Sequence, residues 1–233
     1  MIKSKFKGKL GRKFKIDLIE QISITIFKLK YDLPDRILED IFKIVHVTIS
    51  SIINRISLYL ARFTLPNTEE DRFYIVDSTT IRIGKGKNNK TYSGYKHHHG
   101  VKFQVVINDK NYIKAVSKAY PSSIHDKKIF LSEYSNLTDK INRNLSILGD
   151  KAYVGLFQSN IEVPSKRNEF SYKKDKNKAK IENKNLSSKR IKIEHIFAKM
   201  KNFRILKRLN YYKIHKIEIF FNAIANIYNL SKG

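Results

Sequence analysis

The sequence predicts a mixed α/β (α+β) fold, in which a mixed sheet is flanked by helices and preceded by a small all-α domain. Two short apolar runs, residues 73–77 and 146–150, each end on an aspartate, as expected of buried strands that carry a carboxylate at the carboxyl end. Stretches with apolar residues at helical spacing lie near both ends of the chain. A polar segment with a proline near residue 66 separates the first helices from the first strand. We therefore predict an N-terminal domain, residues 1–66, and a second domain, residues 67–233.

The composition indicates a polyanionic partner. The chain has 233 residues, enough to bury a sizeable core, and its 47 Lys and Arg against 21 Asp and Glu give a formal net charge of +26. Such a surface favours nucleic acid as the partner, ahead of an anionic membrane. Because Lys, Ile and Asn are abundant together, drift towards A/T-rich codons accounts for part of this charge. The charge alone therefore predicts a polyanion and nothing more specific.

Cysteine and long apolar runs are both missing from the sequence. Without cysteine, disulfides, zinc–thiolate sites and thiol nucleophiles are excluded, which suits a reducing compartment. No apolar run approaches the roughly 18 residues that a membrane span needs. The first residues form a basic arm that no signal-peptide apolar segment follows. We expect a cytoplasmic protein with no membrane partner.

Three helices are predicted in the N-terminal domain. Residues 14–30 form the first; Pro34 then sits where a first-turn proline is tolerated and opens a short second helix, residues 35–44. The third, residues 47–63, faces its isoleucines inward and exposes three small polar side chains in its first turn, Thr48, Ser50 and Ser51. Two short helices joined by a tight turn fit a helix-turn-helix that reads a DNA major groove through these three residues. An ordinary three-helix bundle produces the same pattern and is the alternative.

The second domain begins as alternating strands and loops. Further strands are predicted at residues 80–83 and 101–107, on either side of a basic loop, and residues 112–119 complete a hairpin. Residues 121–130 look like a loop that leads into a helix. A tract rich in Lys, Asn and Asp, residues 165–184, is predicted to be a flexible basic loop, and residues 211–230 a helix packed on the sheet.

One more helix is predicted between these two segments, opening after Ser187 or Ser188. It has an apolar stripe, formed by Ile193, Ile196, Phe197, Met200 and Phe203. At the edge of this stripe, Arg190, Glu194 and Lys201 fall within about 40° of one another on the helix. A solvated helix edge with an i,i+4 ion pair is the ordinary interpretation.

Three carboxylates give that edge another interpretation. Asp77 and Asp150 end two predicted strands, and ligand sites of open α/β sheets lie at the carboxyl ends of strands. Glu194 is docked against the same sheet by its helix. Three acids brought together repel unless a divalent cation neutralises them, and oxygen ligands select Mg²⁺ or Mn²⁺. Two such ions about 4 Å apart support phosphoryl transfer; three unrelated structural acids are the alternative.

At these residues the sequence resembles a family. Asp77 and four stretches, residues 92–107, 120–130, 148–156 and 186–206, resemble successive motifs of DDE-class insertion-sequence transposases, in the bacterial group akin to Harbinger elements. The motif of the second aspartate, Asp-x-(Gly/Ala)-Tyr, is matched by Asp150, Ala152 and Tyr153. The last motif, Arg-x₃-Glu-x₆-Lys, is matched by Arg190, Glu194 and Lys201. Residues 41–55 resemble the helix-turn-helix of that group.

The resemblance implies an RNase H-like fold in which Asp77, Asp150 and Glu194 bind two Mg²⁺ or Mn²⁺ ions. It implies that the enzyme cuts double-stranded DNA at the inverted-repeat ends of the element and joins the freed 3′-hydroxyls to target DNA. Arg190 and Lys201 would contact DNA near the cleaved phosphate, and Lys96 and His99 are further DNA contacts that it suggests. Cutting two ends in register favours a dimer on DNA, at the bacterial nucleoid.

Several alternatives accompany this resemblance. Asp126 is the rival second metal ligand, but Asp150 is preferred because it ends an apolar strand, whereas Asp126 suits helix capping. The run His97–His99 is not predicted to bind a metal, since consecutive side chains of an extended segment point to opposite faces. Ser187 stands where the family commonly has a tyrosine. An inactive DNA-binding relative, acting as a repressor or a decaying copy, is the alternative function.

Overall fold

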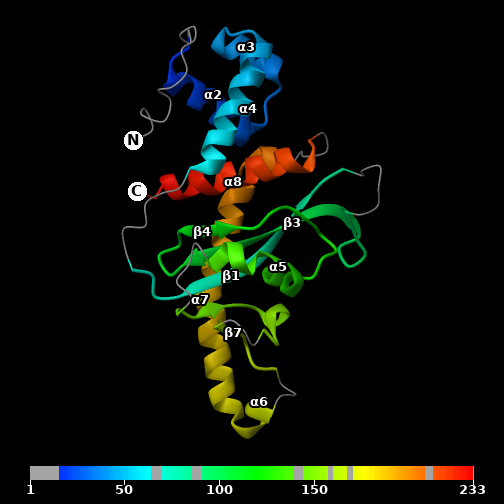
Figure 1. Ribbon diagram of the computed structural model, residues 1–233, viewed down its shortest axis with the longest axis vertical. Helices are drawn as coiled ribbons and strands as arrows, with labels where there is room; N and C mark the ends of the chain where they lie inside the picture. Colours follow the sequence, from blue (N-terminus) through cyan, green and yellow to red (C-terminus); the bar gives the residue numbers. More distant parts are fainter. Residues whose placement is uncertain are drawn as a thin grey trace.

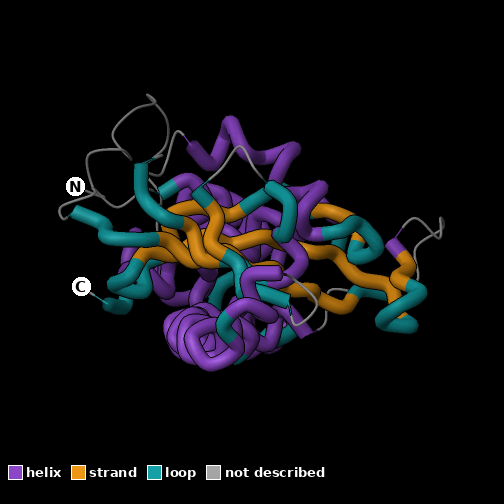
Figure 2. Tube along the Cα trace, turned by 90° about the horizontal axis from the view of Figure 1, so that it is seen from below, coloured by secondary structure: helices purple, strands orange, loops and turns teal. Residues whose placement is uncertain are grey.

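The structure, a computed structural model, describes residues 16–63, 70–84, 91–138, 144–156, 160–166, 170–207 and 212–232. The predicted basic arm, up to residue 15, and the predicted linker near residue 66 lie outside these residues. The described elements confirm the predicted mixed α/β architecture, with helices on a mixed sheet (Figures 1 and 2).

A seven-stranded sheet forms the centre of the molecule, with strand order β2-β3-β1-β6-β7 and with β4 and β5 also paired to β3. β1 (Tyr74–Arg82) pairs antiparallel with β3 (His98–Asn108) along its whole length. The two strands predicted at residues 73–77 and 80–83 are therefore one, because the intervening residues stay in the ladder opposite β3. The remaining strands are short: β2 (Tyr92–Ser93), β4 (Ile113–Val116), β5 (Tyr120–Pro121), β6 (Ile147–Leu148) and β7 (Ile161–Glu162).

The sheet is mixed because β6 and β7 run parallel to β1. Tyr74 pairs with Ile147 and Ile75 with Leu148, and β7 continues the parallel pairing on the far side of β6. β6 ends at Leu148, whereas β1 runs on to Arg82. One edge of β1 is thus left without a neighbouring strand from its middle onwards, and α5 (Asp126–Thr138) packs near β3.

Three N-terminal helices lie at one end of the molecule: α2 (Leu18–Tyr31), α3 (Asp35–Phe42) and α4 (His46–Arg62). The Asp17 side chain caps α2 by accepting from the amide of Ile19, and a left-handed Lys43 ends α3. The axes of α3 and α4 differ by 103°. Among the described helices, none is long and apolar enough by itself to cross a membrane. Only α3 and α4 taken together have the length and apolar composition of a span, and they meet at this sharp bend.

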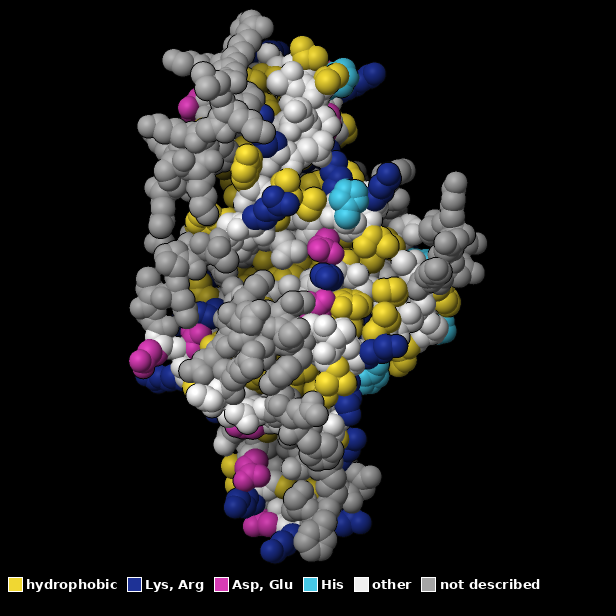
Figure 3. Space-filling model, viewed as in Figure 1, with side chains coloured by type: hydrophobic (Ala, Val, Ile, Leu, Met, Phe, Trp, Pro, Cys, Tyr) yellow, Lys and Arg dark blue, Asp and Glu magenta, His cyan; other side chains and the backbone are white. Residues whose placement is uncertain are grey.

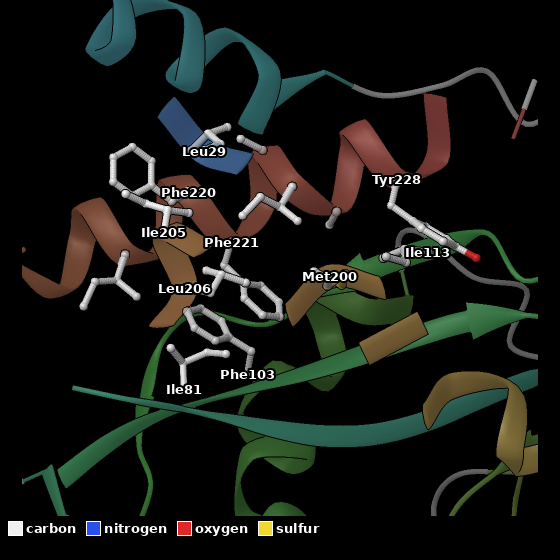
Figure 4. Close-up of a cluster of buried hydrophobic side chains, with 14 of the residues drawn as sticks. Leu29, Ile81, Phe103, Ile113, Met200, Ile205, Leu206, Phe220, Phe221 and Tyr228 are labelled. Atoms are coloured by element: carbon white, nitrogen blue, oxygen red, sulfur yellow. The ribbon is translucent and has the colours of Figure 1, made fainter. Parts of the chain in front are cut away.

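These helices share one apolar core with the sheet. Isoleucines of α4, including Ile49 and Ile56, belong to the same buried cluster as α8 (Ile214–Leu230) and the inner face of β1 and β3. Figure 4 shows the layers in order, with Phe221 of α8 stacked on Phe103 of β3 at 4.0 Å between ring centroids. The side-chain amide of Asn226 on α8 donates to the carbonyl of Leu60 at the end of α4 (2.8 Å). α8 is therefore covered by α4 on one side and by the sheet on the other.

The longest helix, α7 (Lys176–Lys201), runs along the sheet and extends beyond it to α6 (Phe170–Lys174) (Figure 1). Residues 170–174 and 176–184, predicted to belong to a flexible loop, are helical instead, and the predicted helix start at Ser187 or Ser188 is wrong. Asp175 caps the helix by accepting from the amide of Lys178 (2.9 Å), and Lys and Ala are good helix formers. The Asn183 side chain exchanges two hydrogen bonds with the backbone of Ser165, which attaches this part of α7 to the chain before α6.

Candidate active site

The parallel pairing of β1 and β6 brings Asp77 and Asp150 together. The register pairs Ile75 with Leu148, so its continuation by two residues places Asp150 beside Asp77. Parallel strands deliver their carboxyl ends to the same edge of a sheet, where ligand sites form in open α/β folds. Asp77 and Asp150 are thus neighbours. The prediction that Asp77 ends a strand is wrong, because β1 stays paired with β3 as far as Arg82 and Asp77 lies in its middle.

Each of these aspartates is held by a nearby backbone amide. Asp77 Oδ1 accepts from the amide of Ser78 (2.7 Å), and Asp150 Oδ1 accepts from the amide of Ala152 (2.8 Å). The second bond caps a 3₁₀ turn, η2 (Lys151–Tyr153), that folds Tyr153 back under Gly149. A Cβ atom at Gly149 would lie 3.0 Å from the Tyr153 ring, so a larger residue here would have to displace that ring slightly. The turn explains why Asp150, Ala152 and Tyr153 occur as one motif.

Asp77 is a buried carboxyl group with charges of both signs around it. Its pKa is raised from 3.8 to about 6, first because the group is buried. The amide of Ser78 and the charge of Arg190 lower the pKa, while the negative charges of Asp150 and Asp126 raise it. Ionisation of Asp77, in the middle of β1, therefore remains unfavourable, and a cation bound to it would stabilise its charged form.

Cationic side chains from two parts of the chain face this carboxyl group. Arg190 Nη2 lies 3.6 Å from Asp77 Oδ2, and Arg190 Nε is buried with no hydrogen-bond partner among the described residues. Burial lowers the pKa of Lys201, and the charge of Asp77 raises it. Burial also lowers the pKa of Lys96, whose Nζ donates to Thr80 Oγ1 (2.6 Å). The charge of Lys201 lowers this pKa further, and the charge of Asp77 raises it. Three of the predicted DNA contacts, Arg190, Lys201 and Lys96, therefore lie near Asp77.

Glu194, the third predicted metal ligand, is placed less closely. It is exposed on α7, one helical turn after Arg190 and two before Lys201, on the side of the helix that carries both cations. The described residues include no group of three or more His, Cys, Asp or Glu side chains gathered tightly enough to hold a metal ion. The structure brings Asp77 and Asp150 together and leaves Glu194 nearby on the helix that packs against β1.

Asp126 is compensated by a buried lysine. It is the first residue of α5, and its Oδ1 lies 2.8 Å from Lys102 Nζ, which also donates to the carbonyl of Ile124 (2.7 Å). Lys102 is almost fully buried, so losing Asp126 would leave its charge unpaired. This arrangement supports a structural role for Asp126, although its charge still acts on Asp77.

The remaining predicted contacts lie away from the two aspartates or make local bonds. His99 Nδ1 is 3.0 Å from Thr91 Oγ1, and its ring meets that of Tyr92 edge-on, within the β2–β3 pairing. His98 Nδ1 faces the carbonyl of His99 (3.2 Å), so these two rings have separate partners. On α4, Thr48 and Ser51 are exposed and Ser50 is half-buried.

Gln104 and Tyr153 form a buried link that the sequence reasoning missed. Gln104 is fully buried on β3, opposite Ser78, and its Nε2 donates to Tyr153 Oη (2.8 Å) and to the carbonyl of Asp126 (3.2 Å). One side chain therefore ties together β1, the turn after Asp150 and the start of α5. A signal existed, because Lys102 and Gln104 interrupt an otherwise apolar strand.

The donor set of this site fits a divalent metal ion. Asp77 and Asp150 supply hard oxygen ligands, and such an ion would stabilise the charged form of Asp77, which burial disfavours. Each carboxylate has one oxygen bonded to a backbone amide, which orients the other.

Comparisons with known proteins show the family of this chain. Residues 76–229 match the family model described as DDE superfamily endonuclease, a span that begins just before Asp77 and includes Asp150 and Glu194. The chain is also 26% identical over 244 residues to the probable transposase for insertion sequence element IS702 of Microchaete diplosiphon. This alignment covers 97% of this chain and 84% of that relative. The predicted resemblance to DDE-class insertion-sequence transposases is confirmed, and the chain belongs to the DDE superfamily endonuclease family.

Proposed function

We propose that this protein is the transposase of an insertion sequence, which cuts DNA at the inverted-repeat ends of the element and joins the freed ends to target DNA. The observation that carries the proposal is the proximity of Asp77, in the middle of β1, to Asp150, just after the adjacent parallel strand β6, with Arg190 and Lys201 beside Asp77. Membership of an endonuclease family and a relative named as a probable transposase support it.

Asp77, Asp150 and Glu194 would hold two Mg²⁺ or Mn²⁺ ions. When bound, these ions supply activation of the attacking oxygen and stabilisation of the leaving oxygen in an in-line phosphoryl transfer. Buried Asp77 must lose its proton to act as a ligand, so below its metal-free pKa of about 6 the metal ion has to compete with a proton. The α7 helix fixes the position of Glu194, because Ile193 beside it is fully buried.

The surrounding cations have a different task in this proposal. Arg190 neutralises Asp77 in part, and its buried Nε has a donor to spare for a phosphate oxygen. Lys201 and Lys96 add positive charge on the same side. Together they would hold the DNA backbone so that the phosphorus faces the two aspartates. Water first breaks a phosphodiester bond and leaves a 3′-hydroxyl, which then attacks a phosphodiester of the target.

Recognition of the element ends is assigned to the N-terminal region, residues 1–66, as a basic arm and a helix-turn-helix, with α3 and α4 as its two helices. Thr48 and Ser51 are exposed for this role, while Ser50 is only half-exposed. His99 is kept as a DNA contact beside the β2–β3 turn. Two ends must be cut in register, so we propose a dimer on double-stranded DNA in the bacterial cytoplasm, at the nucleoid.

The test is a cleavage assay with the full-length protein, Mg²⁺ and DNA that carries the ends flanking the gene. We expect nicking at the ends, and a loss on the order of 10⁴-fold for Asp77→Ala, Asp150→Ala or Glu194→Ala, as when a catalytic unit is broken. Glu182→Ala, an exposed glutamate of the same helix, is the matched control and should cut normally. Equal nicking by the wild type and Asp150→Ala would refute the assignment.

The alternative, an inactive DNA-binding relative, is favoured by one observation. Arg190 lies against Asp77, and Glu194 is exposed instead of joining the two aspartates. Such a protein would bind the ends and never cut them with either metal. The same assay, run beside a binding measurement, separates the two functions.

A further inference from the structure

One face of α4 is directed to solvent and has an unusual composition for this chain. Val47, Thr48, Ser51 and Asn54 are exposed, and their spacing places them on one side of the helix. We call these four residues the α4 face. Val47 is 66% exposed, while Ile49, Ile52, Ile53 and Ile56 on the opposite side are buried in the core. The helix is therefore fixed, and the α4 face points outward.

The α4 face is electrically neutral although the chain has a net charge of +26. Residues 44–54 contain no Lys, Arg, Asp or Glu. The next cation, Arg55, donates to Gln21 Oε1 (2.6 Å) and is engaged within the helical bundle. His46 Nδ1 lies 2.9 Å from Glu39 Oε2, so it is engaged as well. Apolar methyl groups, hydroxyls and one amide are what the α4 face presents.

These groups suit one kind of base pair. In a major groove, Arg and Lys read guanine and Asp and Glu read the amino group of cytosine, whereas Asn bonds adenine and apolar or Thr methyls contact the thymine methyl. The α4 face has the side chains for adenine and thymine and lacks those for guanine and cytosine. Ser51 accepts either pair.

The chain around the α4 face supplies charge that fits a DNA duplex. Arg36 on α3, Lys43 in the turn and Arg62 at the end of α4 are all exposed, on either side of the neutral stretch. Cations beside a neutral reading surface match phosphates on either side of a groove. Ile37 and Ile41 on α3 and Val45 before α4 are also exposed, and Figure 3 shows hydrophobic side chains on the surface at this end. These apolar side chains favour a protein partner as the alternative to DNA. A protein contact, however, would leave Asn54 and the flanking cations without a role.

We propose that the α4 face reads A·T base pairs in the major groove of the element ends. Val47 and the Thr48 methyl would pack against thymine methyl groups, and the Asn54 amide would bond the N6 and N7 edge of adenine. The inference rests on the proposed transposase function, because it assumes that the protein recognises its own ends. It concerns binding alone, so it is measured in EDTA, where no strand is cut.

The first experiment selects duplexes from a random library with the full-length protein. We expect the selected sites to share a core of A·T pairs. Replacing each core thymine by uracil removes only the methyl, and should weaken binding about fourfold per contacted methyl, the effect of one buried CH₂-sized group. Val47→Ala has already lost part of the contact with the thymine methyl. Replacing thymine by uracil should therefore weaken DNA binding by this variant less than by the wild type.

The second experiment uses a matched pair of asparagines. Asn54→Ala should weaken binding to the selected site by roughly 5- to 150-fold and remove the preference at one A·T pair. Asn177→Ala, an exposed asparagine on α7, should bind as the wild type does. Far-ultraviolet circular dichroism of both variants checks that α4 is intact.

Three results would overturn the inference. They are a selected core that requires G·C pairs, equal binding to thymine and uracil duplexes, and a change of oligomeric state by Val47→Ala with no change in DNA affinity. The last would assign this face to a protein contact. A·T-selective binding by a protein that never cuts its ends would reject the proposed catalysis and leave this inference standing.

Discussion

Asp77 combines the role of a proposed metal ligand with a cost to the metal-free fold. Its pKa is about 6 in the folded protein against 3.8 for the free group, because burial disfavours the charged form. The stability that the protonated group contributes is present below pH 3.8 and is lost as the pH rises through about 6. The ionised carboxylate therefore destabilises the metal-free protein at neutral pH.

Asp77→Asn should remove this cost. We expect the variant to be more stable than the wild type by on the order of 2 kcal/mol at pH 8, and by little at pH 4. Urea unfolding in EDTA at the two pH values measures the difference. Adding Mg²⁺ should raise the melting temperature of the wild type and leave that of the variant unchanged. Asp40→Asn, an exposed aspartate on α3, is the control; a variant that tracks the wild type at both pH values would contradict the buried charge.

Tyr153→Phe isolates one hydrogen bond of the buried link under the site. It removes the acceptor of Gln104 Nε2 and keeps the ring that packs against Phe130. A buried donor left without its partner costs about 1–3 kcal/mol, so the free energy of unfolding should fall by that amount. Denaturant titration measures it, with Tyr95→Phe, whose side chain is 93% exposed, as the control. An unchanged midpoint would show that Gln104 finds another acceptor.

At the scale of single residues, the sequence was informative where chemistry follows local pattern. Asp77 and Asp150 were predictable because each ends a short apolar run, and Arg190 and Lys201 because their helical spacing puts them on one side. Gln104 bonds to Tyr153, 49 residues away. No local pattern encodes that pairing, since it exists only once β3 and the turn after β6 have met.

At the scale of elements, α7 depends on a small number of buried side chains. Ile193 is fully buried between Arg190 and Glu194, whereas Ile191 on the same helix is 50% exposed. Ile193→Ala should lower the free energy of unfolding by about 2–5 kcal/mol through cavity formation. Ile191→Ala should stay within about 0.5 kcal/mol of the wild type, as surface substitutions do. Chemical denaturation of both variants tests this; equal effects would mean that α7 is not held by its apolar stripe.

Element boundaries were less predictable than the elements themselves. Residues 165–184 have a composition typical of a loop, but an Asp175 cap and the Asn183 bonds to Ser165 allow α7 to begin at Lys176. β2, β5 and β7 have two residues each, too few for a periodic pattern. They form because β2 and β5 pair with β3, and β7 pairs with β6. Tertiary contacts decided both outcomes.

At the scale of the whole molecule, α4 and the sheet stabilise each other through α8. The described helices α2 to α4 contribute to the same buried cluster as the sheet. We therefore expect the full-length protein to unfold in one thermal transition, although residues 1–66 and 67–233 were predicted as two domains. Calorimetry measures this, and two separated transitions would contradict it.

Removing the N-terminal region tests whether its helices stabilise the rest of the fold. A fragment of residues 67–233 would expose the face of α8 that α4 covers, including the surroundings of Ile224. We expect it to melt at a lower temperature than the full-length protein and to aggregate on heating. A fragment as stable as the whole chain would show that the two parts fold independently.

The joint between α4, α8 and the sheet also sets a length scale on DNA. Because α4 is packed on α8, the proposed function predicts a fixed distance between the α4 face and Asp77 when both contact DNA. The cut must then fall a constant number of base pairs from the recognised sequence. Inserting about 5 base pairs between them turns the phosphate by half of the 10–10.5 base-pair helical repeat, to the far side of the duplex. Inserting a full helical turn returns the phosphate to the side of the duplex that faces Asp77, but leaves it too far along the DNA for Asp77 to contact it.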